Sequence, residues 1–531
     1  MDDSAVEPMM TSPRVAELVS RVQFGEAAAA RREAERLLAA GYGTTDDATM
    51  LQVVIALGCM IEEGPEAAVA LLQRRLDELD TTDASSAVER GYLIGLRAHM
   101  LVVQDQTPLA LEDLVTVETL LGALDHTRHV VRMLSMNVGV TYGFLAMYPL
   151  AEEHLAPLVE PHGGPWRQAD QMLCYLNLFD NSLRWAQELE RAGLADGPDD
   201  AGFGAHLDDA ERWCTAGLAL LDDLPTDDMA AWGHLLRRGH ILLLAYRHPS
   251  AAIGPARSQL MEDLTSETPG HAAAMASALS LALRRTGQTA EGYDVACQAV
   301  QLAADADRAV VLQATYQRHL ASMALGRSGS VDAHEALRAA HLTIWQGREQ
   351  DVEHVRRRRE LSSLRAQHRD ALAEARRDPL TGVGNRRALD EWLQWRPIGP
   401  ATAFVIDLDA FKLINDRHGH HVGDRVLQLV ATALRQAIRD EDLLVRAGGD
   451  EFVVACDGRE HDPTAMSLRL ARSIASVAVL PELPAGSVTG SVGYAVAEVG
   501  EETTKLFKGA DRMMFERKQP RTDRRRSRSS A

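Results

Sequence analysis

Apolar residues recur at intervals of three and four along roughly the first 345 residues, and this pattern constrains the fold most. Val69, Leu72 and Leu79 form one such series. The spacing places these side chains on one face of an α-helix, whereas runs that alternate every second residue, as strands do, are scarce here. We therefore expect residues 1–345 to form an all-α domain suited to binding a partner, without a catalytic cluster of its own.

Three segments of this region share the order of helix, short break and alanine-rich helix. The breaks lie near Gly64, Gly287 and Gly329, and the last two are 42 residues apart. A period of roughly 34–45 residues with glycine between paired helices resembles tetratricopeptide-type helical arrays. No unit carries the full signature of that repeat, so an irregular α-helical domain remains the alternative.

The charge of the chain excludes some partners. Among 531 residues, 56 are Lys or Arg and 76 are Asp or Glu, which gives a formal net charge of −20. So acidic a protein is a poor candidate for coating a nucleic-acid polymer, because the phosphate backbone attracts clustered positive charge. A pocket for one phosphorylated small molecule needs only one or two basic side chains, so the charge leaves that option open.

Cysteine usage and hydropathy predict a cytoplasmic protein. The five cysteines are far apart in sequence and form no CxxC pair, which fits reduced, buried thiols better than disulfides or a zinc site: Cys59, Cys174, Cys214, Cys297 and Cys456. No apolar run approaches the ~18–20 residues that a membrane span requires. The acidic N-terminus, MDDSAVEPMM, lacks the pattern of a signal peptide.

Residues 346–377 are strongly charged and predict a connecting helix. A narrow apolar stripe with charged flanks is typical of a coiled-coil seam, and a solvated single helix is the alternative. The stripe consists of Val352, Val355, Leu361, Leu364, His368, Leu372 and Ala375. The Asp378–Pro379 step should end the helix, because the residue before proline disfavours helical geometry.

From residue 378 onward, the sequence pattern becomes that of an α+β domain. Residues 401–409 predict a buried strand, the segment DLLVRAGGDEFVVAC predicts a hairpin, and further helices and a strand follow. This domain is expected over residues 378–519. The basic, serine-rich end at residues 520–531 is expected to be a disordered tail.

Two acidic positions of this domain predict a metal site. Asp407 ends an apolar strand, and Asp450 and Glu451 follow Gly448 and Gly449 at the hairpin tip. If the strands are neighbours, the carboxylates of Asp407 and Asp450 converge, and such hard ligands suit Mg²⁺ that also bridges substrate phosphates. The glycines would let a ligand approach the backbone and would allow positive φ.

Five ordered blocks resemble the GGDEF family of diguanylate cyclases. AGGDEF at residues 447–452 resembles the family signature. DPLTGVGNRR precedes it, as does DLDAFKLINDRHGHHVGD, and GSVGYA and ADRMMFERK follow it. The resemblance covers about residues 378–519. It implies a fold like the palm of nucleotide cyclases and polymerases, and the condensation of two GTP into cyclic di-GMP with release of pyrophosphate.

The resemblance also implies the roles of individual residues. Mg²⁺, or Mn²⁺, would be held by Asp407, the Leu408 carbonyl and Asp450, with Glu451 as general base and Lys412 stabilising phosphate charge. The substrate-binding set would be Phe411, Asn415, His420, Asp424, Gly448, Gly449 and Lys518. Among these, Asn415 and Asp424 would bind the guanine edge, which favours GTP over ATP. Arg439 and Asp442 match an RxxD motif that would bind cyclic di-GMP and inhibit the enzyme, with Arg446 in support.

Each domain of this family binds one GTP, so the resemblance implies a homodimer. The connecting helix would set the register of two catalytic domains, and the helical domain, through a ligand or a protein partner, would bias that register. The pattern departs from the family after Lys518, where Gln519-Pro520-Arg521 lacks the usual glycine. A non-catalytic receptor for cyclic di-GMP or GTP is the main alternative, and a helical scaffold is the third.

Overall fold

The structure is a computed structural model that describes residues 11–23, 25–79, 86–159, 168–195, 202–222, 227–266, 268–304, 306, 308–327, 330–395, 400–457, 462–477, 487–498 and 503–518. It divides into two compact units, Met1–Ser363 and Leu364–Ala531, which are treated separately. The expected tail at residues 520–531, Arg521 and Gly329 lie outside the described residues.

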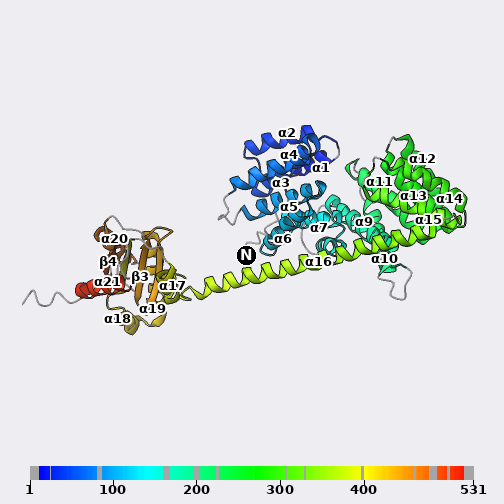
Figure 1. Cartoon of the computed structure of the whole chain (residues 1–531). Helices are drawn as coiled ribbons and strands as arrows, with labels where there is room; N and C mark the ends of the chain where they lie inside the picture. The colour runs from blue at the N-terminus through cyan, green and yellow to red at the C-terminus, as the bar shows by residue number, and fades with distance from the viewer. Residues whose placement is uncertain are drawn as a thin grey trace, which may run out of the picture. The chain divides into compact units, whose positions relative to one another are not determined.

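The first unit is built of helices that pack against their neighbours in sequence (Figure 1). They are α1 Pro13–Gln23, α2 Ala27–Ala39, α3 Thr45–Glu63, α4 Pro65–Glu78, α5 Ala87–Val103, α6 Thr107–Leu121, α7 His129–Phe144, α8 Tyr148–Val159, α9 Gln168–Ala192, α10 Phe203–Asp222, α11 Asp227–Arg247, α12 Pro249–Thr265, α13 Pro269–Arg285, α14 Thr289–Leu302 and α15 Arg308–Ala324. The mostly helical prediction for this region is confirmed. Gly64 and Gly287 lie between paired helices, as the sequence predicts, and both have positive φ.

Helix α16, Ser330–Ala375, begins earlier than the expected connecting helix and runs without interruption. The side chains of Val352 and Val355 are only 3% and 2% exposed, because they join the core formed by α1–α9 of the first unit. Further along, Leu361 and Leu364 are 54% and 53% exposed. The predicted seam is therefore wrong at Val352 and Val355, whose apolar surface is already covered within the chain.

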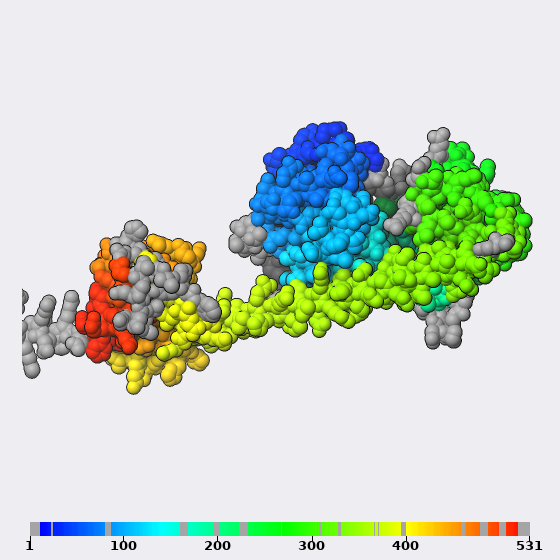
Figure 2. All heavy atoms as spheres, viewed as in Figure 1, coloured from blue at the N-terminus to red at the C-terminus, as the bar shows by residue number. Residues whose placement is uncertain are grey.

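Charged contacts fasten the same part of α16 to the first unit. The carboxylate of Glu153 accepts hydrogen bonds from Arg356 and Arg359, both at 2.8 Å. Burial alone would raise the pKa of Glu153, but these hydrogen bonds outweigh it and lower the pKa below its usual value. Arg359 also lies 3.0 Å from the buried carboxylate of Glu118. In Figure 2 the yellow-green atoms of this stretch lie against the helical unit.

The second unit contains a four-stranded antiparallel sheet in the order β2-β3-β1-β4. Its elements are α17 Arg386–Trp395, β1 Ala401–Leu408, α18 Phe411–His418, α19 His420–Ala437, β2 Leu443–Gly448, β3 Glu451–Asp457, α20 Pro463–Ala475, β4 Gly490–Ala497 and α21 Thr503–Lys518. The α+β prediction, with its strand, hairpin and closing helix, is confirmed for this unit.

Helices cover both faces of this sheet, which explains why every residue of β1 is buried. Phe404, Ile406 and Leu408 face the core shared with α18, α19 and α20. Val405 faces the opposite way, toward a second cluster that contains Ala510 and Met514 of α21. Because side chains alternate along a strand, Asp407 shares the α21 face with Val405. The Asp407 carboxylate at the end of β1 therefore lies on the face of the sheet that α21 covers.

The turn after α16 joins that helix to the sheet. The side-chain amide of Asn385 donates to the carbonyls of Ala375 and Arg377, and its oxygen accepts from the backbone of Ala388 in α17. Gly384 exchanges backbone hydrogen bonds with β2, at 2.9 Å to the Leu444 carbonyl and 2.8 Å from the Arg446 amide. The end of α16 is therefore fixed to the edge of the sheet and to α17.

The cysteines are free, and all but the partly buried Cys297 are buried. Burial raises the pKa of the Cys174 thiol, and it raises that of Cys214 to about 12. These two thiols are therefore protonated and act as small apolar groups. Within the described residues, no helix is long and apolar enough to cross a membrane.

We expect Gly493→Ala to destabilise the second unit severely. A Cβ there would overlap backbone atoms of Ala510 and Met514 in α21, which cannot rotate away. The cost should reach at least about 3 kcal/mol, the upper end for overpacking. Calorimetry of the full chain would measure it. Gly347→Ala in α16 is the control: its Cβ meets open space, so it should gain about 0.5–1 kcal/mol. Equal melting of both variants would contradict this account.

Candidate active site

The ends of three strands gather polar groups in one row. In the sheet register Asp407 of β1 lies directly opposite Glu451 of β3 and Ser491 of β4. The backbone amide of Leu408 donates to the carbonyl of Asp450 at 3.2 Å, so the hairpin tip is fixed beside the end of β1. The predicted neighbourhood of Asp407, Asp450 and Glu451 is therefore present.

Asp407 and Glu451 are like charges in directly opposed positions, an arrangement that destabilises a sheet. The Asp407 side chain is nearly buried, and the ammonium group of Lys518 at the end of α21 donates to it. Burial alone would lower the pKa of Lys518, but the hydrogen bond and the charge of Asp407 raise it. Lys518 thus keeps its positive charge and partly offsets the acidic row.

The two glycines of the tip leave space above the backbone. A Cβ on Gly449 would meet no atom within 4 Å, and one on Gly448 would meet only the carboxylate of Glu451, at 3.8 Å. Neither glycine has positive φ, contrary to the expectation from sequence. The absence of side chains therefore serves open access to the tip rather than an unusual backbone conformation.

Arg446 braces the tip, a role that sequence reasoning missed. Its guanidinium donates to the Gly449 carbonyl at 2.8 and 3.0 Å and to the carboxylate of Asp378 at 3.2 and 3.3 Å. Burial alone would raise the pKa of Asp378, but the hydrogen bonds from Thr381 and Arg446 lower it below its usual value. Arg446 therefore ties the tip to the motif that follows α16.

The loop after β1 turns sharply into α18. Ala410 has φ of 55°, in the left-handed region, although it is not glycine. The carboxylate of Asp409 holds this turn against β4, because it accepts from the hydroxyls of Thr489 and Ser491, both at 2.8 Å. In the first turn of α18, Phe411 is buried and Lys412 is exposed. Sequence reasoning missed this function of Asp409.

Helices α18 and α19 bring two predicted substrate residues together. The Asn415 side chain packs against Gly423, where any Cβ would collide with its amide oxygen, and Asp424 is the next residue. The amide oxygen of Asn415 is buried and accepts no hydrogen bond among the described residues. Asp424 and His420 are exposed. An unpaired acceptor beside an exposed carboxylate suits a ligand that carries N–H donors.

The RxxD residues form a turn between α19 and β2. Asp442 is buried, and its carboxylate accepts from the backbone amide of Arg439 at 3.0 Å. The Arg439 side chain is exposed. In this structure Asp442 stabilises the turn, and Arg439 offers its side chain to the surface.

The residues at the strand ends fit a divalent cation. Asp407 and Asp450 supply hard carboxylate oxygens, which Mg²⁺ uses singly or in pairs and completes with water and phosphate oxygens. Within the described ranges, no group of three or more His, Cys, Asp or Glu side chains could hold a metal ion. Asp407 and Asp450 thus offer two carboxylates at neighbouring chain positions, and there is open space at the two glycines of the tip.

Comparison with known proteins identifies the domain. Residues 375–524 match the family described as "Diguanylate cyclase, GGDEF domain". The chain is 33% identical over 210 residues to Diguanylate cyclase DgcP of Pseudomonas aeruginosa, covering 38% of this chain and 31% of that protein. It is also 33% identical over 158 residues to Diguanylate cyclase DgcS of Shewanella oneidensis, covering 29% and 52%. The protein therefore carries a GGDEF domain of the diguanylate cyclase kind.

The matches concern this domain and not the whole chain, which spans from about a third to a half of the first curated relatives it matches. One similar solved structure is that of the coiled coil and GGDEF domain of DgcB from Caulobacter crescentus in complex with c-di-GMP. It is 25% identical with a TM-score of 0.28, and the match covers 32% of this chain and 92% of that one.

We expect Arg446→Met to loosen the hairpin tip. The substitution removes charged hydrogen bonds to Gly449 and Asp378 and should destabilise the second unit by about 1–3 kcal/mol. Hydrogen exchange of the backbone amides in residues 447–452 should quicken, as mass spectrometry would detect. Arg512→Met, at an exposed position of α21, is the matched control. Unchanged exchange in the Arg446 variant would contradict the bracing role.

Proposed function

We propose that this protein is a diguanylate cyclase that condenses two GTP into cyclic di-GMP and releases pyrophosphate. The observation that carries the proposal is the hydrogen bond from Leu408 to Asp450, which joins two carboxylate-bearing strand ends beneath an open glycine tip. The family match of the same residues supports the reaction.

In the proposed reaction Asp407, the Leu408 carbonyl and Asp450 would hold Mg²⁺ or Mn²⁺. When bound, the metal would supply positive charge to the phosphates and to the attacking oxygen. Glu451 lies in the same row and is exposed, so it is suited to accept the proton of the 3′-hydroxyl. Lys412 would stabilise charge on the phosphates, and Lys518 would limit repulsion within the acidic row.

Selection of guanine over adenine would rest on Asn415 and Asp424. Guanine offers N1–H and N2–H₂ donors on one edge, and a carboxylate accepts such a pair. The amide oxygen of Asn415, which has no partner among the described residues, would supply a further acceptor beside Asp424. Phe411 would support this pocket from the core, and His420 would line it at the start of α19.

The reaction also requires two domains, since each would bind one GTP. We propose a homodimer in which exposed apolar residues of α16, among them Leu361 and Leu364, pack against a second copy. We also propose that the protein is cytoplasmic. The helical unit would be a tetratricopeptide-like array and would bind a protein partner. A nucleic-acid polymer is not expected to bind.

We expect the purified protein to convert GTP, but not ATP, to cyclic di-GMP in the presence of Mg²⁺. Asp450→Asn should lower the rate about a hundredfold or more, because it removes a metal ligand while preserving shape. Asp457→Asn, at the exposed opposite end of β3, should keep the rate. Chromatography of the nucleotides would measure both. Full activity of the Asp450 variant would refute the metal assignment.

A second candidate function is that of a non-catalytic receptor. The exposed side chain of Arg439 favours a surface site for cyclic di-GMP, with Asp442 holding the turn. In the cyclase the same site would inhibit the enzyme. Titration calorimetry separates these cases: Arg439→Ala should weaken cyclic di-GMP binding but spare turnover. A wild-type protein that binds cyclic di-GMP yet forms no product at high concentration would favour the receptor.

We further propose that the helical unit regulates the cyclase through α16. The middle of this helix is held by the burial of Val352 and Val355 and by the pairing of Arg359 with Glu118 and Glu153. Glu118 also receives the His154 ring at 2.9 Å, so the anchor includes α6 and α8. A rearrangement of these helices would change how firmly α16 is held, and the continuous helix would carry that change toward the turn at Asn385.

We expect Arg359→Met to release the middle of α16. It leaves the buried carboxylate of Glu118 with less compensation, a loss of about 1–3 kcal/mol. Hydrogen exchange over residues 348–362 should quicken, and the rate of cyclic di-GMP formation should change at least about threefold. Arg358→Met, in the same arginine run but exposed, should alter neither. Faster exchange with an unchanged rate would remove the regulatory role while leaving the anchor.

A further inference from the structure

The helical unit contains a cavity of about 330 Å³ between α9, α11, α13 and α15. Its volume lies at the lower end of the range of about 300–1,000 Å³ that is typical of small-molecule sites. The wall is mostly apolar and includes Phe179, Leu183, Leu242, Met275 and Val310. Apolar surface around a space of this size favours an apolar occupant over water.

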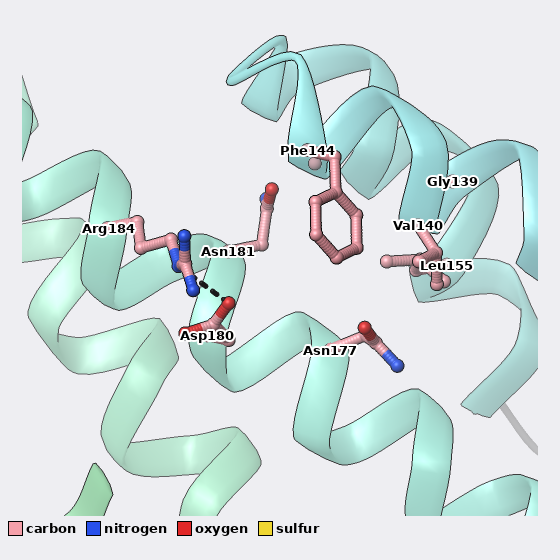
Figure 3. A pocket seen from close by; sticks show the side chains of 9 residues that line it. Gly139, Val140, Phe144, Leu155, Asn177, Asp180, Asn181 and Arg184 are labelled. Atoms are coloured by element: carbon pink, nitrogen blue, oxygen red, sulfur yellow. Dashed lines mark ion pairs between the residues drawn. The ribbon is translucent and has the colours of Figure 1, made fainter. Parts of the chain in front are cut away.

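Helix α9 also borders a second, smaller hollow of about 40 Å³. Figure 3 shows it between α7 and α9, with the ring of Phe144 facing Asn177 and the Asp180–Arg184 ion pair at its edge. Asn177, Asp180 and Arg184 contribute to both spaces. These three residues of α9 therefore form a polar rim of the larger cavity, while its apolar volume lies on the side of α11, α13 and α15.

The arginines that line the larger cavity are matched by acidic partners. Arg238 donates to the fully buried carboxylate of Asp263, at 3.0 and 3.1 Å through its Nε. Arg184 pairs with Asp180 at 2.7 Å. Because each positive charge has its own carboxylate, the cavity gives a charged ligand no net electrostatic gain, and burial of its charge would be costly. An uncharged ligand fits this balance.

Among the described residues, one buried donor of a wall residue has no hydrogen-bond partner. Gln313 of α15 is 8% exposed, and its amide oxygen accepts from Arg191 at 2.8 Å. That contact fixes the side-chain amide, whose nitrogen makes no hydrogen bond among the described residues. An unpaired buried donor is unfavourable, so a ligand that brings an acceptor to it would gain affinity.

His271 of α13 adds a second polar position to the wall. Its Nδ1 makes no hydrogen bond in the described part of the chain. Burial, and next the charge of Arg238, lower the pKa of His271, although Asp263 acts in the opposite direction. The ring is therefore neutral near pH 7 and adds no charge to the cavity.

We propose that this cavity binds an uncharged, mainly apolar small molecule whose carbonyl oxygen accepts a hydrogen bond from the amide nitrogen of Gln313. The site does not depend on the cyclase assignment, since all of its residues lie in the helical unit. It has a physical route to α16, because α9 supplies wall residue Gln187 and also Glu188, which pairs with Arg348. The ligand would thus be an input signal for this protein.

Nile red is a suitable probe, because it is uncharged, largely apolar and carries a carbonyl oxygen. Titrated into the full chain, it should give saturable fluorescence with one site per chain. Ala274→Phe, at a partly exposed position of the wall, should fill the cavity and abolish this signal. Ala251→Phe, at an exposed alanine of α12, is the matched control and should leave binding unchanged.

Gln313→Glu tests the hydrogen bond separately. Glutamate keeps an oxygen acceptor for Arg191 but loses the N–H donor, so the Kd of the dye should rise about tenfold while the melting temperature is retained. Equal binding to the wild type and the Ala274 variant, or no saturable binding to the wild type, would overturn the proposal. The readout is dye fluorescence, so its failure is distinguishable from an absence of cyclase activity.

Discussion

The hydrogen bond between the Leu408 amide and the Asp450 carbonyl is the contact on which the candidate active site depends. It joins the end of β1 to the hairpin tip and so brings two acidic strand ends together. The same register sets Asp407 opposite Glu451, an unfavourable pairing in a sheet. Arg446 fixes the tip through the Gly449 carbonyl, and Lys518 supplies positive charge to Asp407. A sheet selected for stability alone would have little use for this acidic row. The acidic row is understandable if, as proposed, a cation and phosphates complete it.

Much of the second unit could be predicted from the sequence because its signals are local. A continuous apolar run ending in Asp407 predicts a buried strand, and paired glycines between two apolar runs predict a hairpin. The contacts that fix the hairpin tip and Asp407 were harder to predict. Arg446 and Asp378 are 68 positions apart, and Lys518 lies 111 positions from Asp407. No local pattern links such residues, because their contact exists only after the sheet and α21 have packed.

The connecting helix illustrates a different limit. The apolar stripe correctly predicted a helix, but periodicity identifies a face and not its partner. Val352 and Val355 are covered by the core of α1–α9, whereas Leu361 and Leu364 are exposed. A second copy and the same chain offer equivalent apolar surface, so only the tertiary structure decides between them. Likewise, the sequence identified the glycines of the tip but gave the wrong reason for them. It predicted positive φ, whereas the structure shows that they leave open space above the backbone.

The ion pairs that hold α16 against the first unit have free energies that would suit the proposed regulation. Exposed ion pairs such as Arg356 with Glu153 contribute about 0–1 kcal/mol each, too little to hold a helix alone. Glu118 is different, because its side chain is 5% exposed and loss of Arg359 would leave its charge poorly compensated. A change of about 1.4 kcal/mol alters an equilibrium tenfold. Under the proposed regulation, small rearrangements of α6, α8 or α9 would therefore be sufficient to change the fraction of chains in which α16 is held. Since α9 contributes to both the apolar cavity and the contact with Arg348, a ligand of modest affinity could supply that energy.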